Sequence, residues 1–290
     1  VLLVFASLLI FYKAGLPLGL SLFAGAMGMA LWFGHSLPEA AGIISKVTTG
    51  RDALLLLAVV WSILTLTILM NETGQMKRMI GVVRGIVPSR RAALAILPAM
   101  IGFLPMPGGA VVSAPMVDAA DEDGRVDATH KAALNFWFRH SWECWWPLYP
   151  AVLMTFDMAR RMFGISMARF AAIMMPLTFF HVASGILFLL LPMKMGDRKP
   201  RPAGRVMDLA VTMLPIFILI AVWLLAGRLT IRFTDSHYVP MLGGIWAAIA
   251  WVHVRGGAGR THWRGIVLNR RIYMLMFVVA GVLAFLEVLN

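Results

Sequence analysis

Long apolar runs separated by short basic or polar segments dominate the hydrophobic pattern of this 290-residue chain. A helix needs about 20 apolar residues to cross a bilayer. The pattern therefore predicts an all-α polytopic membrane protein with about eight spans. The expected spans are residues 1–12, 15–34, 53–71, 132–156, 170–192, 209–227, 238–254 and 272–290.

The segments between these spans differ in character. Residues 35–52 are amphipathic and are expected to lie at the membrane interface. Residues 72–91 are interpreted as a basic loop, residues 157–169 as a short connector, and residues 193–208 as a Pro-rich, basic cytoplasmic linker. Glu39, Asp52 and the acidic segment 118–127 are interpreted as solvated, because they resemble neither a membrane metal site nor a calcium loop.

Residues 92–117 are apolar enough to enter a bilayer but are interrupted by prolines and glycines. Pro98, Pro105 and Pro107 disfavour a continuous helix, and Gly108 and Gly109 permit a tight reversal. The arms on either side are too short to cross a hydrocarbon core of about 30 Å. The sequence predicts a re-entrant helical hairpin, and the alternative is one proline-kinked spanning helix.

The distribution of charge favours the hairpin. The chain carries a formal net charge of +12, and its Lys and Arg residues cluster in short loops, which does not suggest nucleic-acid binding. With a hairpin, one side of the membrane receives 18 Lys and Arg and the other 7. With a spanning helix the division is 11 to 14, and the positive-inside rule fails.

An internal similarity suggests two inverted repeats. Residues 53–71 align without gaps with residues 272–290, and an odd number of crossings separates them. We expect a first repeat at 1–192, which includes the hairpin, and a second, inverted repeat at 209–290, truncated before its own hairpin. The chain is thus expected to be part of a longer protein with ten spans. Inverted repeats are typical of secondary transporters, which bind substrate near the bilayer midplane.

The segments LMNETG, FLPMPGGAVVSAP and FRHSWECWWPLYP resemble the uncharacterised integral-membrane branch catalogued as domain of unknown function 401. Broken hairpins in two inverted halves resemble the ion transporter superfamily, which includes carriers of dicarboxylates, citrate, gluconate, lactate and arsenite, and sodium–proton carriers. The resemblance implies ten spans with two hairpins, a homodimer, and elevator-like movement. It does not fix a substrate.

The hairpin tip is the first candidate site. Its substrate-binding candidates are Pro107, Gly108, Gly109, Ala110 and Ser113. Backbone N–H groups at the start of the second arm favour an anion such as a carboxylate. Alternatively, the glycines only make the turn and Ser113 bonds within its own helix.

The span 132–156 is the second candidate. Asn135, Arg139 and Glu143 are expected on one helix face, with His140 at its border. Asn135 and Arg139 are predicted to bind substrate, and His140 and Glu143 to carry a coupling proton. An internal Arg139–Glu143 pair is the alternative. The tryptophans Trp142, Trp145 and Trp146 are interpreted as packing or interface residues.

Two further polar sets are interpreted separately. Thr67 and Asn71 are candidates for ion coupling, with a sodium ion near Asn71, and helix-end hydrogen bonding is the alternative. The stripe Thr178, His181 and Ser184 is interpreted as interhelical hydrogen bonding. The single cysteine, Cys144, excludes an internal disulfide, and no cofactor is expected.

These features predict a secondary transporter of a small organic anion, coupled to H⁺ or Na⁺. We expect a multi-pass protein of a prokaryotic inner (plasma) membrane, a homodimer whose partners are the lipid bilayer and the anion. Walker, HExxH and GxSxG motifs are absent from the sequence, so ATP-driven pumping and the best-known intramembrane hydrolases are not supported. The alternatives are a cation–proton antiporter, a membrane enzyme subunit and a scaffold.

Overall fold

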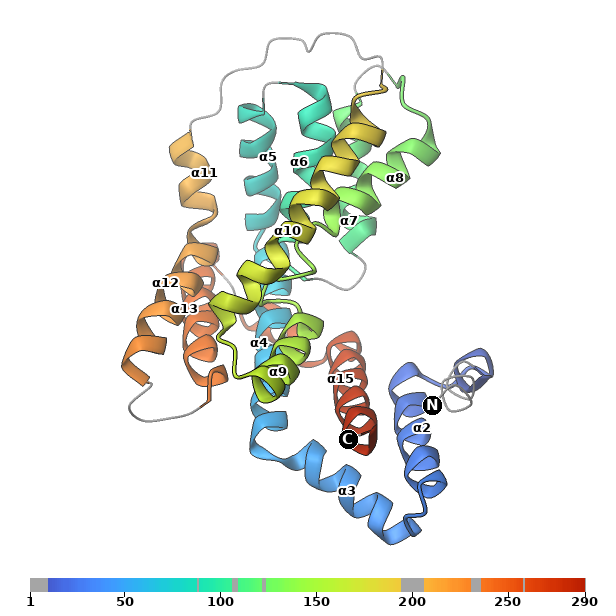
Figure 1. Ribbon diagram of the computed structural model, residues 1–290. Helices are drawn as coiled ribbons and strands as arrows, with labels where there is room; N and C mark the ends of the chain where they lie inside the picture. The colour runs from blue at the N-terminus through green and yellow to red at the C-terminus, as the bar shows by residue number, and fades with distance from the viewer. Residues whose placement is uncertain are drawn as a thin grey trace. The chain divides into compact units, whose positions relative to one another are not determined.

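The computed structural model describes residues 10–87, 89–105, 109–121, 124–193, 206–230, 236–257 and 259–289. Within these ranges the chain is helical and contains no strand, as the hydrophobic pattern predicts (Figure 1). Contacts divide the chain into two compact units. Unit 1 comprises Val1–Thr65, Leu219–Ala248 and Gly259–Asn290, and unit 2 comprises Leu66–Ile218 and Ile249–Ala258.

The helices are distributed between the two units as follows. Unit 1 holds α2 (Leu18–Trp32), α3 (Leu37–Thr49), α14 (Arg260–Val267) and α15 (Arg270–Leu289). Unit 2 holds α5 (Gln75–Ile86), α6 (Arg90–Gly102), α7 (Gly109–Ala120), α8 (Ala128–Arg139), α9 (Pro150–Phe163), α10 (Met167–Gly185), the π-helix η1 (Ile186–Leu190) and α11 (Val206–Thr212). Residues of α4 (Arg51–Glu72), α12 (Leu214–Thr230) and α13 (Tyr238–Gly256) contribute to both.

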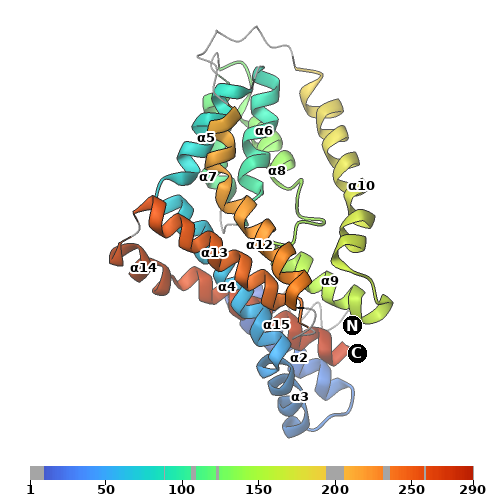
Figure 2. The same ribbon diagram turned by 90° about the vertical axis from the view of Figure 1, so that its left-hand side faces the viewer.

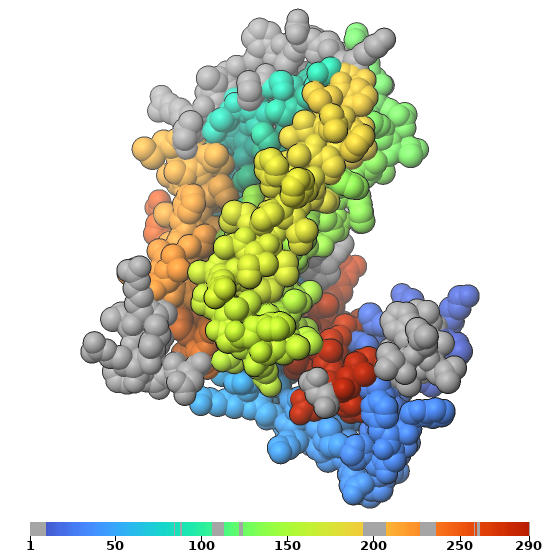
Figure 3. Space-filling view, in the orientation of Figure 1, coloured from blue at the N-terminus to red at the C-terminus, as the bar shows by residue number. Residues whose placement is uncertain are grey.

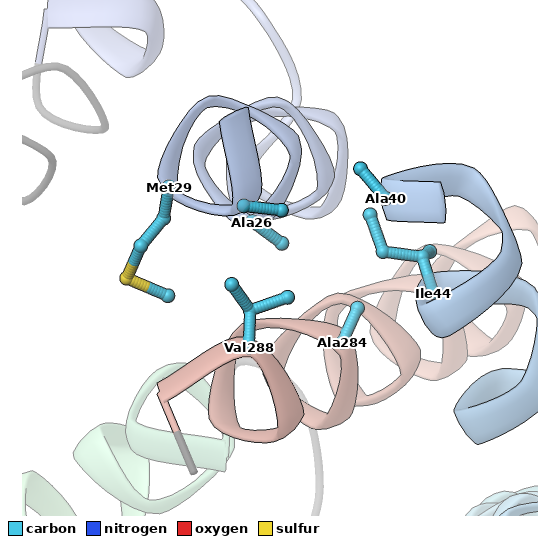
Figure 4. Close-up of a cluster of buried hydrophobic side chains, with 7 residues drawn as sticks. Ala26, Met29, Ala40, Ile44, Ala284 and Val288 are labelled. Atoms are coloured by element: carbon cyan, nitrogen blue, oxygen red, sulfur yellow. The ribbon is translucent and has the colours of Figure 1, made fainter. Parts of the chain in front are cut away.

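Small residues let α2 and α15 pack closely in unit 1. A side chain added at Gly281 would meet the Cβ of Leu22 at 2.8 Å and the carbonyl oxygen of Gly19 at 3.1 Å. A buried cluster continues this contact onto α3. Figure 4 shows its side chains, which include Ala26, Met29, Ala40, Ile44, Ala284 and Val288. Close approach over glycine and alanine is how apolar helices associate in lipid.

The amphipathic segment 35–52 forms α3. Ser36 and Glu39 make a capping box at its start, with Glu39 Oε2 accepting from the Ser36 backbone N–H at 2.8 Å. Glu39 is exposed, as expected, and the hydrogen bonds from the backbone and hydroxyl of Ser36 lower the pKa of its carboxyl group. The helix is confirmed, and its location at a membrane interface stays a prediction.

Among the described residues, three helices are long and apolar enough to cross a membrane: Arg51–Glu72, Met167–Leu190 and His262–Leu289. Leu18–Trp32 and Leu214–Ala226 are shorter apolar helices. These helices differ in how far they are covered. Most of the first is buried inside the protein, whereas α10 lies along the surface with Phe179 and Phe180 exposed (Figure 3).

The prediction of a basic loop at 72–91 is wrong, because this segment contains the helix α5. Gly74 adopts a left-handed conformation, with φ of +70°, and separates α5 from the end of α4. The basic residues of α5 suggest a loop in the sequence, but the helix also has an apolar face. The buried members of that face are Met76, Met79, Ile80 and Val83.

Two expected spans are interrupted. Residues 132–156 form α8 and the start of α9 with turns at 140–149 between them, and residues 209–227 divide between α11 and α12 at Met213. The expected connector 157–169 is mostly helical, because α9 continues to Phe163 and ends at Gly164 in a left-handed conformation. Apolar content alone did not locate these breaks.

Candidate functional site

The interrupted stretch 92–117 is not one continuous helix. α6 ends at Gly102, residues 103–105 are non-helical, and α7 begins at Gly109. The two helices pack against each other, and with α5 and α8 they form the group at one end of unit 2 (Figure 2). Gly109 and Ala110 open α7 as expected, while Pro107 and Gly108 lie outside the described residues. The helical break is confirmed, and its depth in a membrane stays a prediction.

Two side-chain contacts fix the register between α7 and α8. Ser113 Oγ donates a hydrogen bond to Asn135 Oδ1 at 2.5 Å, and both residues are buried. Lys131 Nζ lies 2.7 Å from Asp118 Oδ1. Asp118 follows Ser113 along α7, whereas its partner Lys131 precedes Asn135 along α8. The two helices are therefore antiparallel. Gly109, one turn before Ser113, is therefore level with Arg139, one turn after Asn135.

The end of α6 meets the same level. A Cβ added at Gly102 would lie 2.0 Å from the carbonyl oxygen of Arg139 and 2.9 Å from its carbonyl carbon. The backbones of α6 and α8 are therefore in direct contact at this point. Arg139 itself is buried, with 6% of its surface exposed. The end of α6, the start of α7 and the end of α8 thus converge on one place in unit 2.

Three aromatic donors from the segment after α8 cap the end of α6. The pairs are Trp142 Nε1 to Ala99 O at 2.7 Å, Trp146 Nε1 to Phe103 O at 2.9 Å, and Tyr149 Oη to Gly102 O at 2.5 Å. The ring of Phe103 lies 4.4 Å from that of Trp142 and 4.5 Å from that of Trp146. Trp142 and Trp146 therefore do more than pack, because they bind the carbonyl groups that the broken helix leaves open.

The remaining carbonyl groups at this helix end are also satisfied. Met100 O accepts from the N–H of Phe103 at 3.3 Å, and Ile101 O accepts from the N–H of Leu104 at 3.2 Å. A helix end inside a membrane needs such partners, because hydrocarbon offers none. The capping role of Trp142, Trp146 and Tyr149 is not predicted from the sequence. Donor side chains beside Pro147 and Pro150, where a helix is disfavoured, were the available signal.

The second break, between α8 and α9, corrects the prediction for Glu143. α8 ends at Arg139, so Asn135 and Arg139 share a helix as expected but Glu143 lies in the following turns. Pro150 occupies the first turn of α9, where its missing N–H is tolerated.

Side chains of α10 satisfy the backbone at this second break. His181 Nε2 lies 2.8 Å from Trp137 O, and Thr178 Oγ1 donates to Ser141 O at 2.9 Å. The predicted interhelical hydrogen bonding is confirmed for these two residues. Ser184 instead donates to His181 O within its own helix at 2.9 Å.

His140 and Glu143 lie together in the turn after α8. His140 Nε2 is 3.6 Å from Glu143 Oε1, and both side chains are partly exposed. The other ring nitrogen, Nδ1, lies 2.5 Å from Phe136 O. A carbonyl oxygen only accepts, so Nδ1 carries the hydrogen in the neutral ring. Nε2 is then the ring nitrogen without a hydrogen, and it lies beside the carboxylate of Glu143.

The two residues predicted to hold sodium are placed differently. Thr67 is buried, and its hydroxyl donates to Pro105 O, at the α6–α7 break, at 3.4 Å. Asn71 is exposed, and its carbonyl accepts from the N–H of Gly74 at 3.0 Å. Thr67 therefore contacts the break, while Asn71 takes part in the helix-end hydrogen bonding that was the alternative.

Asp121 corrects the prediction of a solvated acidic segment. Its side chain is fully buried, accepts from the N–H groups of Arg125 and Val126 at 3.1 and 3.0 Å, and pairs with Lys131 at 3.0 Å. Burial alone would raise the pKa of Asp121, but these hydrogen bonds outweigh it and lower the pKa. Hydrogen bonds to Asp118 and Asp121 raise the pKa of Lys131. This cluster holds the α7–α8 connection that sets the register of the site.

Comparison with known proteins identifies a family without a known activity. A family described as protein of unknown function (DUF401) matches residues 1–284 of the chain. No curated protein and no solved structure matches it.

Proposed function

The chain belongs to this DUF401 family, and from the geometry of its site we propose that it is a secondary transporter of a small organic anion in a membrane. Helices broken beside one another, with satisfied backbone ends, are the construction that transporters use for midplane sites. We propose that the α6–α7 hairpin re-enters from one side. An inverted repeat, elevator-like movement, a homodimer and an inner-membrane location complete this proposal, in line with the ion transporter resemblance.

The observation that carries the proposal is the convergence of three helix ends at Arg139. The negative end of α6 is neutralised, because its carbonyl groups accept from Trp142, Tyr149 and Trp146. The positive end of α7 lies level with Arg139, whose cationic side chain is buried. A helix N-terminus and a guanidinium both attract anions, and arginine binds a carboxylate through two parallel hydrogen bonds. Ser113 and Asn135 hold the two helices in this register.

The His140–Glu143 pair supports a proton as the coupling ion. Nε2 of His140 faces Glu143 at 3.6 Å, so a proton taken up there gains an ion pair without a change of tautomer. Arg139 directly precedes His140 in the chain. The alternative coupling ion is sodium, bound at Thr67 and Asn71. Uptake that a sodium gradient drives without proton movement would support it.

The same pair favours a second candidate, cation–proton antiport. In that function His140 and Glu143 exchange a proton for a cation and no organic anion binds. Proteoliposomes distinguish the two functions: anion uptake that acidifies the lumen supports symport, whereas proton release driven by a cation gradient, without anion, supports antiport. A membrane enzyme subunit or a scaffold predicts neither movement, and we propose transport without catalysis.

Uptake of radiolabelled carboxylates into proteoliposomes tests the anion site. We expect Arg139→Gln to lower uptake by about 10- to 100-fold, the loss of one charge-assisted hydrogen-bonding partner, and Ser113→Ala to lower it less. Arg139→Lys keeps the positive charge but removes the planar guanidinium. It therefore distinguishes the effect of charge from that of two parallel hydrogen bonds. Ser184→Ala is the matched control, because Ser184 bonds within α10. Full uptake by a folded Arg139→Gln protein would refute the site.

A further inference from the structure

The turn between α14 and α15 exposes arginines that no acidic residue of the same region neutralises. Arg264, Arg270 and Arg271 are all exposed. From residue 236 to residue 286 the sequence contains no Asp or Glu. Two arginines of α9 do have such a partner: Arg160 and Arg161 lie 3.1 and 2.8 Å from the carboxylate oxygens of Asp157.

Helix stability does not explain these arginines. Arg270 and Arg271 open α15, where the positive end of the helix dipole repels them. Arg160 and Arg161, by contrast, occupy the last turn of α9, where a cation is favourable. Arg270 and Arg271 thus lie at the N-terminal end of a membrane-length helix, where positive charge is unfavourable. Their position points to an anion from outside the chain.

Exposed apolar side chains alternate with these arginines. Val267 is 47% exposed and Leu268 68%, and Tyr273 and Met274, on the first turn of α15, are 46% and 47% exposed. Ile266, on the other face of α14, is fully buried. We call α14, the following turn and the first turn of α15 the α14–α15 corner. One face of this corner packs against the protein. The other face combines apolar side chains with positive charge, as in helices that lie in a membrane surface.

The corner is held in a defined conformation. Tyr273 Oη donates to Val267 O at 2.7 Å, and Asn269 Oδ1 accepts from the N–H of Arg271 at 3.0 Å. The N–H of Leu268 bonds Arg264 O at 3.0 Å. α14 therefore leads into α15 through a turn that these hydrogen bonds hold (Figure 2).

We propose that Arg264, Arg270 and Arg271 form a binding surface for the headgroups of anionic phospholipids, with Leu268 and Val267 in the adjoining acyl region. Phosphate groups at the bilayer surface supply the missing negative charge, and the acyl chains cover the exposed apolar side chains. The proposal rests on the membrane location proposed above but not on transport.

Lipid retention by the full chain tests the proposal. The protein is extracted from bilayers of equal phosphatidylglycerol and phosphatidylcholine, and native mass spectrometry measures which lipid it retains. We expect enrichment of phosphatidylglycerol, reduced by about fivefold for each arginine neutralised in Arg264→Gln/Arg270→Gln/Arg271→Gln. The matched triple lysine variant retains the enrichment, as does Arg160→Gln/Arg161→Gln, which removes arginines that already have an acidic partner.

Each outcome decides a separate point. Equal enrichment in the wild type and a folded triple glutamine variant overturns the proposal, as does wild-type protein that inserts without any lipid preference. Displacement of phosphatidylglycerol by excess inorganic phosphate would show a site for small anions rather than a lipid surface. Protein that does not partition into bilayers refutes the membrane location itself, while loss of transport with intact lipid preference leaves this surface unaffected.

Discussion

Gly102→Ala tests directly whether α6 and α8 meet backbone to backbone. The added Cβ would lie 2.0 Å from Arg139 O, whereas ordinary contact begins at 3.4 Å. The obstacle is backbone, so no side chain can rotate out of the way. Separating the two helices by this difference also strains the hydrogen bond from Tyr149 to Gly102 O. Overpacking of this kind costs about 1–3 kcal/mol.

Thermal unfolding of the purified protein and uptake in proteoliposomes measure the effect. We expect a lower unfolding midpoint for Gly102→Ala. We also expect uptake to fall by more than the loss of stability explains, because Arg139 moves with the helix end. Gly81→Ala is the matched control: Gly81 lies within α5 with nothing inside 4 Å of its added Cβ. That change should be neutral or stabilise by up to about 1 kcal/mol through helix propensity. Unchanged stability and uptake in Gly102→Ala would refute the contact.

Two further substitutions test groups that hold the site. Trp146→Phe keeps a ring beside Phe103 but leaves Phe103 O without its donor, so we expect a loss of about 1–3 kcal/mol on chemical unfolding. Trp145→Phe should lose far less, because Trp145 Nε1 has no hydrogen-bond partner among the described residues. Asp121→Asn should lower the unfolding midpoint near neutral pH, whereas Asp118→Asn, at a side chain 73% exposed, should barely change it. Because the pKa of Asp121 is lowered, its contribution is present above about pH 4 and is lost as the pH falls through the folded-state pKa. A wild-type midpoint that does not fall relative to Asp121→Asn on acidification would contradict this role.

Much of the fold could be predicted from apolar pattern and proline position. The helix of residues 53–71, the helix of residues 170–192 and the break within 92–117 are all present. These features depend on local properties, namely apolar length and the missing N–H of proline. The helix α5 was missed because its basic residues suggested a loop, although its buried methionines recur at helical spacing.

The candidate site could be predicted only in part. The sequence indicates both Ser113 and Asn135 as candidates, but their contact depends on the register between α7 and α8, which Asp118, Asp121 and Lys131 set. The sequence predicts Glu143 on a helix face that does not form. The aromatic residues at 140–149 give this segment the apolar character of a membrane span, although it forms turns. Capping of α6 by tryptophans is a tertiary contact, so no spacing within one segment reveals it.

We propose that the chain enters and leaves the membrane on the same side between α5 and α8, and single cysteines test this topology directly. Single cysteines can be placed at Lys77 and Thr129, both exposed, in a Cys144→Ser background, with Met162→Cys as the control for the opposite face. A membrane-impermeant maleimide is then applied to vesicles of known orientation. A re-entrant hairpin predicts that positions 77 and 129 react from one side and position 162 from the other. Reaction of positions 77 and 129 from opposite sides would contradict the account.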